Sequence, residues 1–182
     1  MVSSVLFVSL LIVGCGGGGG DNDPSEVQFK TIVAGVNHSF ALSNNGKVYA
    51  AGYNEYGQLG LGDTTDRNTF TKVTSLSGKN ITAIFAGDYH SLALSSDGKV
   101  YATGQNAYGQ LGLGDTTDCN TFTDVTSLSG KTIIAISVGG FHSLALSNDG
   151  KIYATGNNYY GQLGLGDNAD RKTFTKVTVW DD

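Results

Sequence analysis

An internal repeat constrains the fold of this 182-residue chain more than any other feature of its sequence. Residues 34–85 and 86–137 are identical at 39 of 52 aligned positions, and a third copy follows from Val138. Units of this length that recur in tandem are typical of propellers and solenoids, in which each unit stacks on its neighbours. Three sets of residues recur at this spacing and are interpreted as structural: His38, His90 and His142; Gly57, Gly109 and Gly161; Asp63, Asp115 and Asp167.

Each copy is predicted to contain four short strands. In the second copy they are expected at residues 81–87, 90–95, 99–104 and 122–126. Asp97-Gly98 predicts a type I′ hairpin turn between the second and third strands. The other copies carry Asn45-Gly46 and Asp149-Gly150 at this place. The chain has 27 glycines and one proline, and β-branched and aromatic residues are plentiful, which favours strands over helices. The sequence therefore predicts an all-β fold of three four-stranded β-propeller blades, in a partial or open propeller.

The first 26 residues differ from the repeats. Residues 5–13 form an apolar run that is too short to span a bilayer but suits the core of a signal peptide. The run ends in "IVGC", which is similar to a bacterial lipobox. A lipoprotein signal peptide is therefore predicted over residues 1–15, with a lipid on Cys15. No Lys or Arg precedes the run, so a plain signal peptide and an apolar tail stay open as alternatives.

The domain organisation follows from these two parts. Residues 16–26 are rich in glycine and are expected to be a flexible linker. Residues 27–180 are expected to hold the three repeats, over about 27–78, 79–130 and 131–180. The expected location is outside the cytoplasm, on a bacterial membrane, with the outer membrane or cell surface favoured.

The residues around the histidines resemble a known repeat. "AGVNHSFAL", "AGDYHSLAL" and "VGGFHSLAL", each followed by "GQLGLGD", are similar to the regulator of chromosome condensation repeat over residues 27–180. The resemblance implies a propeller that closes with seven blades, a ring that three units cannot complete. It also implies guanine-nucleotide exchange on a nuclear GTPase, together with chromatin binding. Exchange activity is kept only as an unfavoured alternative for this acidic chain with an export signal.

The glycine-rich loop at residues 55–68 is the first candidate for chemistry. Its glycines have the order G-x-x-G-x-G, and neither a helix nor a Lys-Ser/Thr pair follows them. A phosphate-binding loop is therefore rejected. Asp63, Asp66 and Asn68 suit calcium by residue type, but turn capping by their side chains is the favoured interpretation.

The histidines suggest a zinc site when they are taken together, yet each begins a strand in a different blade. They are interpreted as structural residues with hydrogen bonds between strands. A serine follows each histidine (Ser39, Ser91 and Ser143), but neighbouring residues of a strand point to opposite faces, so no catalytic His–Ser pair is expected. Cys119 is interpreted as a surface residue. The prediction is that the protein is no enzyme and has neither cofactor nor metal.

The copies differ from one another mainly at a few loop positions. These positions lie before each histidine and before each "YGQLGLG", and many carry aromatic or amide side chains. One interpretation is neutral drift on exposed turns, and the other is a protein-binding surface on one rim. The candidate partner-binding residues are Asn37, Tyr53, Glu55, Tyr89, Gln105, Phe141, Asn157 and Tyr159.

The function predicted from these features is a lipid-anchored, non-enzymatic protein-binding or scaffold module. The formal net charge of −5 disfavours nucleic acid as a partner. Two alternatives stay open. The first alternative is a fragment of a larger propeller, which the end at "VTVWDD" suggests. The second is a unit that self-assembles through open blades into a homo-oligomer.

Overall fold

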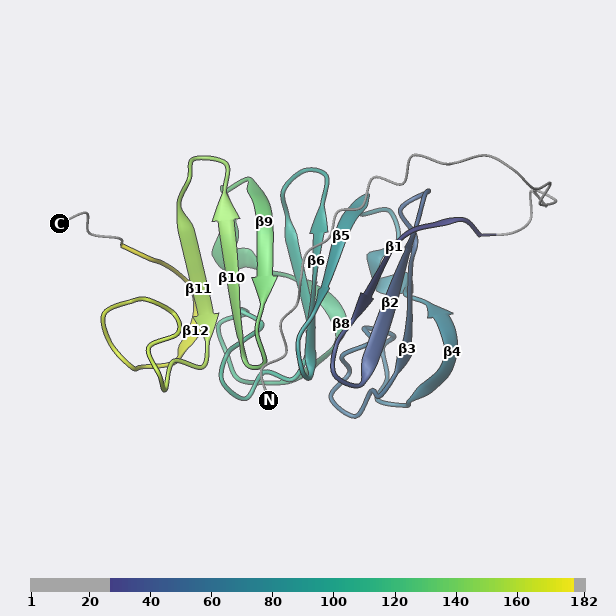
Figure 1. Ribbon diagram of the computed structural model, residues 1–182, viewed down its shortest axis with the longest axis horizontal. Helices are drawn as coiled ribbons and strands as arrows, with labels where there is room; N and C mark the ends of the chain where they lie inside the picture. Colours follow the sequence, from purple (N-terminus) through teal and green to yellow (C-terminus); the bar gives the residue numbers. More distant parts are fainter. Residues whose placement is uncertain (1–26, 179–182) are drawn as a thin grey trace, which may run out of the picture.

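A computed structural model of the protein describes residues 27–178. These residues form three four-stranded antiparallel sheets, each made of four strands that are consecutive in the sequence (Figure 1). The predicted all-β fold of three propeller-type blades is confirmed, and the blades form an open stack. The predicted signal peptide, Cys15 and the linker lie outside the described residues. No helix in the described range is long and apolar enough to cross a membrane.

The strands of each blade run in sequence order across its sheet. The first blade contains β1 (Phe29–Ala34), β2 (His38–Ser43), β3 (Val48–Gly52) and β4 (Arg67–Lys72). The second contains β5 (Ile81–Ala86), β6 (His90–Ser95), β7 (Val100–Gly104) and β8 (Cys119–Asp124). The third contains β9 (Ile133–Val138), β10 (His142–Ser147), β11 (Ile152–Gly156) and β12 (Arg171–Lys176). Short 3₁₀ helices follow β4 and β8, namely η1 (Thr74–Leu76) and η2 (Thr126–Leu128).

The fourth strand of the second blade begins earlier than predicted, at Cys119 instead of Phe122. Cys119 pairs with Gly104 beyond an irregularity in the ladder between β7 and β8. Because of this irregularity the alternation of side chains is broken, and the early part of the strand does not show the expected pattern.

The hairpins between the second and third strands differ from the predicted type I′ turns. A type I′ turn needs positive φ at both central residues, but among the described non-glycine residues only Asn80 has a positive φ. Gly98 has φ 78°, its amide donates to the Ser95 carbonyl over 3.0 Å, and the Ser95 amide donates to the Lys99 carbonyl over 3.0 Å. The hairpin is thus a three-residue loop in which only the glycine takes a left-handed conformation, so Asp97 avoids that strain. Asn45-Gly46 and Asp149-Gly150 form the same turn.

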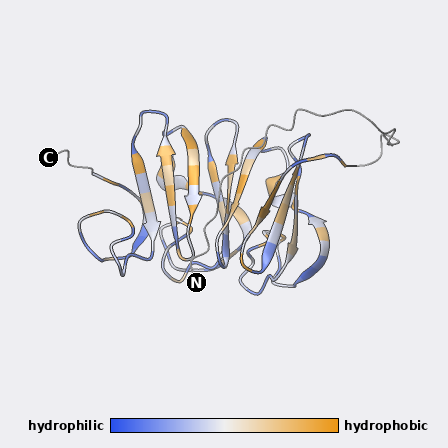
Figure 2. Cartoon of the chain, in the orientation of Figure 1, coloured by the Kyte–Doolittle hydropathy of each residue, from blue (hydrophilic) through white to orange (hydrophobic). Residues whose placement is uncertain are grey.

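The blades pack face to face through alternating large and small side chains. On β6, Leu92 and Leu94 pack into the core with the third blade, whereas Ala93 between them packs into the core with the first blade. β1 lies against β5, and β5 against β9, so the sheets converge at their first strands. Figure 2 shows that the hydrophobic residues are concentrated on the strands and that the loops at both ends are mostly hydrophilic. The fold is therefore a fan of sheets held by two hydrophobic cores.

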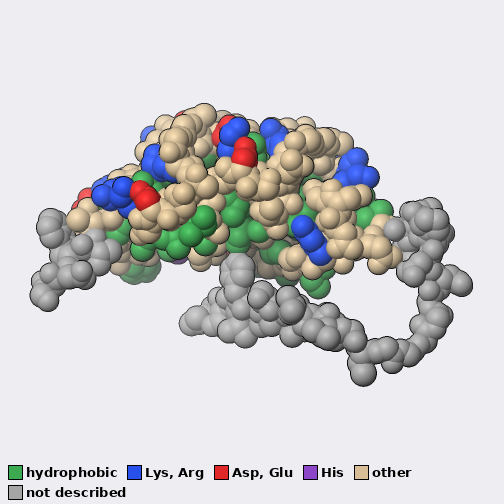
Figure 3. Space-filling model, turned by 90° about the horizontal axis from the view of Figure 1, so that it is seen from above, with side chains coloured by type: hydrophobic (Ala, Val, Ile, Leu, Met, Phe, Trp, Pro, Cys, Tyr) green, Lys and Arg blue, Asp and Glu red, His purple; other side chains and the backbone are tan. Residues whose placement is uncertain are grey.

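The two ends of the stack carry different loops. The loops between first and second strands and between third and fourth strands lie at one end, called here the loop edge, at the bottom of Figure 1. The hairpins between second and third strands lie at the other end, called the hairpin edge. Figure 3 looks onto the hairpin edge and shows basic and acidic side chains there, beside a band of hydrophobic side chains. Two hairpins close an ion pair of their own, Lys99–Asp97 at 3.5 Å and Lys151–Asp149 at 2.5 Å.

Candidate functional site

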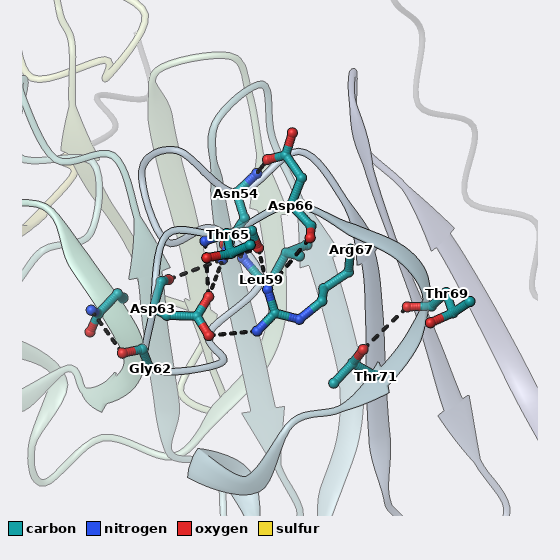
Figure 4. A network of polar contacts seen from close by, with 10 residues as sticks. Asn54, Leu59, Gly62, Asp63, Thr65, Asp66, Arg67, Thr69 and Thr71 are labelled. Carbon is teal, nitrogen blue, oxygen red and sulfur yellow. Dashed lines mark hydrogen bonds and ion pairs between the residues drawn. The ribbon is translucent and has the colours of Figure 1, made fainter.

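The glycine-rich loop of each blade is organised around one buried asparagine. In the first blade, Asn54 Nδ2 donates to the carbonyl of Asp63 over 3.0 Å, and its Oδ1 accepts the Leu59 amide over 2.9 Å (Figure 4). The carboxylates of Asp63 and Asp66 accept the backbone amides of Thr65 (2.9 Å) and Asn54 (2.7 Å). These four bonds recur in the other blades, around Asn106 and Asn158. The asparagine and aspartate side chains are thus used within the loop, while its backbone groups contact the next blade.

The ion pair beside this network is dispensable for the loop. Arg67 and Asp63 form an ion pair at 2.5 Å, and the hydrogen bond from Arg67 lowers the pKa of the Asp63 carboxyl (Figure 4). Cys119 stands at the arginine position in the second blade and makes no such pair, yet the bonds of Asn106 and Asp115 remain. The sequence reasoning overlooked these asparagines, although all three copies carry them.

The histidines join neighbouring blades through serine hydroxyls. His38 Nε2 lies 2.9 Å from Ser91 Oγ in the second blade, and His90 Nε2 lies 2.9 Å from Ser143 Oγ in the third. A serine therefore pairs with the histidine of the preceding blade, never with the one beside it in the sequence. Adjacent His and Ser residues do not pair with each other, in line with their position on opposite faces of the strand. The pairs between neighbouring blades were not predicted, because the spacing of residues along one strand carries no information about them.

The direction of these hydrogen bonds fixes the state of the imidazoles. Ser91 Oγ donates its proton to the Gln58 carbonyl over 2.9 Å, so His38 Nε2 is the donor to Ser91 Oγ. His38 Nδ1 then carries the lone pair, is buried, and has no hydrogen-bond partner among the described residues. Burial lowers the pKa of His38 to about 4. For His90, burial and the neighbouring histidines lower the pKa to about 3.

These His–Ser pairs connect neighbouring blades, and they are buried away from any substrate. Ser91 and Ser143 are both fully buried, and each donates to a backbone carbonyl. A nucleophilic serine needs an exposed hydroxyl that its histidine can deprotonate, whereas here the serine proton is already directed to the backbone. The geometry therefore favours a structural role.

A continuous row of aromatic rings crosses the loop edge. The Tyr56 ring lies 5.4 Å from Tyr89, Tyr89 lies 6.2 Å from Phe141, and Phe141 lies 5.5 Å from Tyr108. Tyr53 lies 6.3 Å from both Tyr56 and Tyr89. These five residues, called here the aromatic row, come from all three blades and are each half-buried or exposed. The Tyr89–Phe141 pair is tilted and the other pairs are edge-to-face, and such contacts hold the rings in place without burying them.

Three of the candidate binding residues from the sequence belong to this row, and the structure adds two more. Tyr53, Tyr89 and Phe141 were selected because they vary between copies. Tyr56 and Tyr108 belong to the constant "YGQLGLG" segment, so a comparison of variable positions passed over them. The sequence does contain an indication of these two residues, because a tyrosine precedes the "GQLGLG" segment in all three copies.

The other candidates lie outside the row. Gln105 and Asn157 are half-buried and accept hydrogen bonds from Gln110 (3.4 Å) and Gln162 (2.7 Å) in their own loops. Tyr159 is 70% exposed, and its ring lies edge-to-face against Tyr160 at 4.8 Å. Asn37 and Glu55 are exposed.

Position 53 shows what the change between copies does. Tyr53 stands where the other blades have Gln105 and Asn157, which serve as acceptors for the loop glutamine. Gln58 Nε2 consequently has no hydrogen-bond partner within the described residues, although it is buried. The Tyr53 hydroxyl instead donates to Glu55, and this hydrogen bond raises the pKa of Tyr53 to about 12. The first blade thus gains a surface ring and loses an internal bond.

Comparison with known proteins places this geometry in a family. The sequence profile of the RCC1-like domain matches residues 17–181. The chain is 38% identical over 156 residues to the ultraviolet-B receptor UVR8 of Arabidopsis thaliana, covering 86% of this chain and 36% of the receptor. It is 39% identical over 151 residues to the human X-linked retinitis pigmentosa GTPase regulator, covering 80% of this chain and 15% of that protein.

Solved structures agree with this assignment. Yeast RCC1 (Prp20), determined with Kap60, matches with a TM-score of 0.76 and 25% identity, over 84% of this chain and 37% of that chain. Human WBSCR16 matches with a TM-score of 0.76 and 27% identity, over 86% of this chain and 41% of that one. The chain thus spans less than half the length of each of these four relatives. Because the profile covers nearly the whole sequence and the blades superpose on propeller structures, the chain belongs to the RCC1-like domain family.

Proposed function

We propose that this chain is a non-enzymatic protein-binding module that is held on a cell envelope by a lipid on Cys15 and contacts its partner through the aromatic row. The observation that carries this proposal is the row itself, in which five rings from three blades form one surface on the loop edge. Tyrosine and other aromatic residues are enriched where proteins bind one another, because they bury much area at little cost in side-chain entropy.

The relatives support a protein as the partner. The yeast RCC1 structure contains Kap60, and a second study of Prp20p concerns its binding to Gsp1p and histones. Those partners belong to those proteins. For this chain they support only the general role of an RCC1-like domain as a surface for other proteins. The net charge of −5 adds to this by disfavouring a polyanion.

The contrast between the two ends of the stack supports the position of the surface. On the hairpin edge, Asp97 and Asp149 already pair with Lys99 and Lys151 within their own turns. On the loop edge, the rings leave apolar area exposed beside polar loops. A partner can therefore bury the apolar surface of the aromatic row on the loop edge, whereas at the hairpin turns it would have to compete with existing ion pairs.

Replacing three members of the aromatic row is expected to weaken partner binding at least tenfold while the fold is kept. The substitutions Tyr53→Gln, Tyr89→Asn and Phe141→Asn use residues that other copies of the repeat carry at the same positions, so the blades should accept them. Loss of several aromatic anchors typically costs at least 1–2 kcal/mol in binding free energy, or about tenfold or more. Binding is measured by crosslinking and capture from solubilised envelopes of the source cells, followed by titration of the captured protein.

The matched control is Tyr159→Ala, which removes an exposed tyrosine of the same loop type outside the aromatic row. This variant should bind as the wild type does. If the triple variant retains full affinity with its circular dichroism unchanged, the aromatic row is not the contact surface.

The anchor is tested separately. Cys15→Ser removes the thiol to which a lipid would be attached, and is expected to stop incorporation of labelled palmitate. Since one cysteine carries the anchor in this proposal, the variant should also leave the membrane fraction. The matched control is Cys119→Ser, at the other cysteine of the chain, which should keep both label and location. Equal labelling of wild type and Cys15→Ser would contradict lipidation at Cys15.

A further inference from the structure

The chain forms the same blade-to-blade interface twice. In both, a histidine contacts a serine of the next blade at 2.9 Å, and that serine donates to a glutamine carbonyl of the preceding blade at 2.9 Å. In both, a loop glycine amide donates to a backbone carbonyl of the next blade's fourth strand at 2.8 Å. One isolated β-bridge accompanies each of these bonds, Leu61 with Thr121 and Leu113 with Thr173. The interface therefore has two unlike halves, one on each face of a blade.

The outer face of the first blade exposes the half that receives a preceding blade. Ile84 and Ile136 are 3% and 4% exposed where they pack on the preceding blade, but the equivalent Ile32 is 79% exposed. A phenylalanine of the fourth strand shows the same difference in exposure: Phe122 in the second blade is 5% exposed, whereas the equivalent Phe70 in the first blade is 50% exposed. Both side chains are apolar, and both would be covered by one more blade.

The outer face of the third blade exposes the opposite half. A Cβ on Gly57 would lie 2.4 Å from Asn120 Cα, and one on Gly109 would lie 2.5 Å from Lys172 Cα, because the next blade presses against both glycines. A Cβ on the equivalent Gly161 would meet no described atom within 4 Å.

The second loop glycine shows the same contrast. A Cβ on Gly60 would lie 2.4 Å from the ring of Phe122, and one on Gly112 would lie 2.5 Å from the ring of Phe174. At the equivalent Gly164 the closest atom is Val177 Cγ1, at 3.6 Å. The third blade therefore has the glycine surface on which a phenylalanine of a following blade packs.

We propose that a second copy of this chain docks head to tail, with its first blade on the outer face of the third blade. The internal interfaces define the contacts. Phe70 of the second copy packs on Gly164, Ser39 of the second copy meets His142, and Thr69 of the second copy lies opposite Leu165. The occupant is a copy of the chain because each open face is complementary to the other, and because this pairing is continuous with two interfaces that already exist.

Two positions make the contact between copies weaker than the contacts within a chain. The hydroxyls of Thr103 and Thr155 lie 2.8 Å from the carbonyls of Gly57 and Gly109 in the preceding blade. Each also lies near a carbonyl of its own blade, at 2.7 Å from Cys119 and 2.8 Å from Arg171, so its single proton is shared between two acceptors. The first blade has Ala51 at this position and has no hydroxyl to offer to Gly161. The first blade also has Asn37 where Tyr89 and Phe141 extend the aromatic row. The association is thus reversible and depends on concentration.

The proposed contact joins two different faces of the chain, so further copies can be added at either end of the assembly. A heterologous interface leaves one open face at each end of the assembly and builds either rings or open filaments. Sedimentation velocity of the purified full chain, from low micromolar to near-millimolar concentration, is expected to show a sedimentation coefficient that rises with concentration. A wild-type chain that remains monomeric throughout this range would overturn the proposal.

Variants on each face make the test specific. Gly161→Ala places a methyl group on the third-blade face, and Ile32→Asp places a charge on the first-blade face, at positions where neither touches a core within the chain. Each variant alone is expected to remain monomeric. An equimolar mixture should form dimers and nothing larger, because each variant keeps the face that the other has lost. Association that persists in both single variants, or a mixture that stays monomeric, would contradict head-to-tail stacking.

A change that strengthens the contact completes the design. Ala51→Thr places a hydroxyl where Thr103 and Thr155 have one, so it is expected to tighten self-association by up to several-fold. One neutral hydrogen bond is the upper limit, because the same proton also has an acceptor within its own blade. Unchanged or weaker association of this variant would count against the proposed register. Because Ala51 is only half-buried, the fold itself should accept threonine, which circular dichroism checks.

Discussion

Replacement of Gly57 by alanine is expected to lower the free energy of unfolding by about 2–5 kcal/mol, whereas Gly161→Ala should lower it by only about 1–2 kcal/mol. Both glycines have nearly the same left-handed backbone, with φ 76° and φ 75°, so both substitutions carry the same conformational cost. They differ in what lies next to them. The second blade stands against Gly57, and no described residue stands against Gly161.

The larger effect at Gly57 comes from overlap with backbone. A methyl group there would meet Asn120 Cα at 2.4 Å, and relief of this overlap requires a shift of β8 relative to the first blade. Overpacking of this kind adds about 1–3 kcal/mol to the cost of the left-handed conformation. Since domains of this size are stable by only about 5–15 kcal/mol, much of the total is lost.

Urea unfolding followed by circular dichroism, in dilute protein, measures both variants. Gly109→Ala is a second test, because it also faces the backbone of a following blade, and it should resemble Gly57→Ala. Equal destabilisation by Gly57→Ala and Gly161→Ala would mean that contact between blades does not explain the glycine at this position.

Acidification from pH 7 to pH 5 is expected to lower the free energy of unfolding by about 3–4 kcal/mol. His38 and His90 have pKa values near 4 and near 3 in the folded protein, below the ordinary value of 6.5. Below pH 6.5 the unfolded chain takes up protons that the folded chain does not, so stability falls as the pH falls. The loss begins near pH 6.5 and levels off only below the folded-state pKa values.

The carboxylates contribute little to the change in unfolding free energy between pH 6.5 and pH 5. The pKa values of Asp63, Asp97, Asp149 and Asp167 are lowered from 3.8 by hydrogen bonds to Arg, Ser or Lys. Their contribution to stability is present above the ordinary value and is lost only as the pH falls further. The slope between pH 6.5 and pH 5 therefore reports the histidines, and the carboxylates add to it only below about pH 5.

The variant His38→Gln tests how much of the slope of unfolding free energy against pH comes from His38. His38→Gln keeps a side-chain N–H for Ser91 but cannot be protonated, so the slope of unfolding free energy against pH should decrease by about 1.4 kcal/mol per pH unit near pH 5. The slope is independent of any constant loss caused by the substitution. A wild-type protein with equal stability at pH 7 and pH 5 would show that the imidazoles are protonated in the fold.

Within a blade, the sequence was a good guide to structure. The spacing of "HSLALS" predicted β6 at its observed bounds, because alternation of large and small residues is a local property of a strand. The turn after it was not predicted correctly. Asp97-Gly98 fits either a type I′ turn or a three-residue loop, and backbone hydrogen bonds from Ser95 decide between them.

Contacts between blades were beyond the reach of the sequence. The bond between His38 and Ser91 joins residues that are 53 positions apart, and their meeting depends on how one sheet stacks on the next. The aromatic row was found only in part for a related reason. Tyr56 and Tyr108 do not vary between copies, so their exposure at a shared edge became visible only in three dimensions.

The alternation of unlike faces along the stack also bears on how such chains change length. The middle blade contacts a neighbour on each side, so it carries a complete pair of complementary faces within one 52-residue period. Duplication of that period in a gene would insert a blade whose two faces match those already present, and every existing joint would be reproduced. Deletion of one period would rejoin the remaining blades in the same manner. Whole-unit gain and loss is thus tolerated by the architecture, whereas an insertion of part of a unit would separate a histidine from its serine.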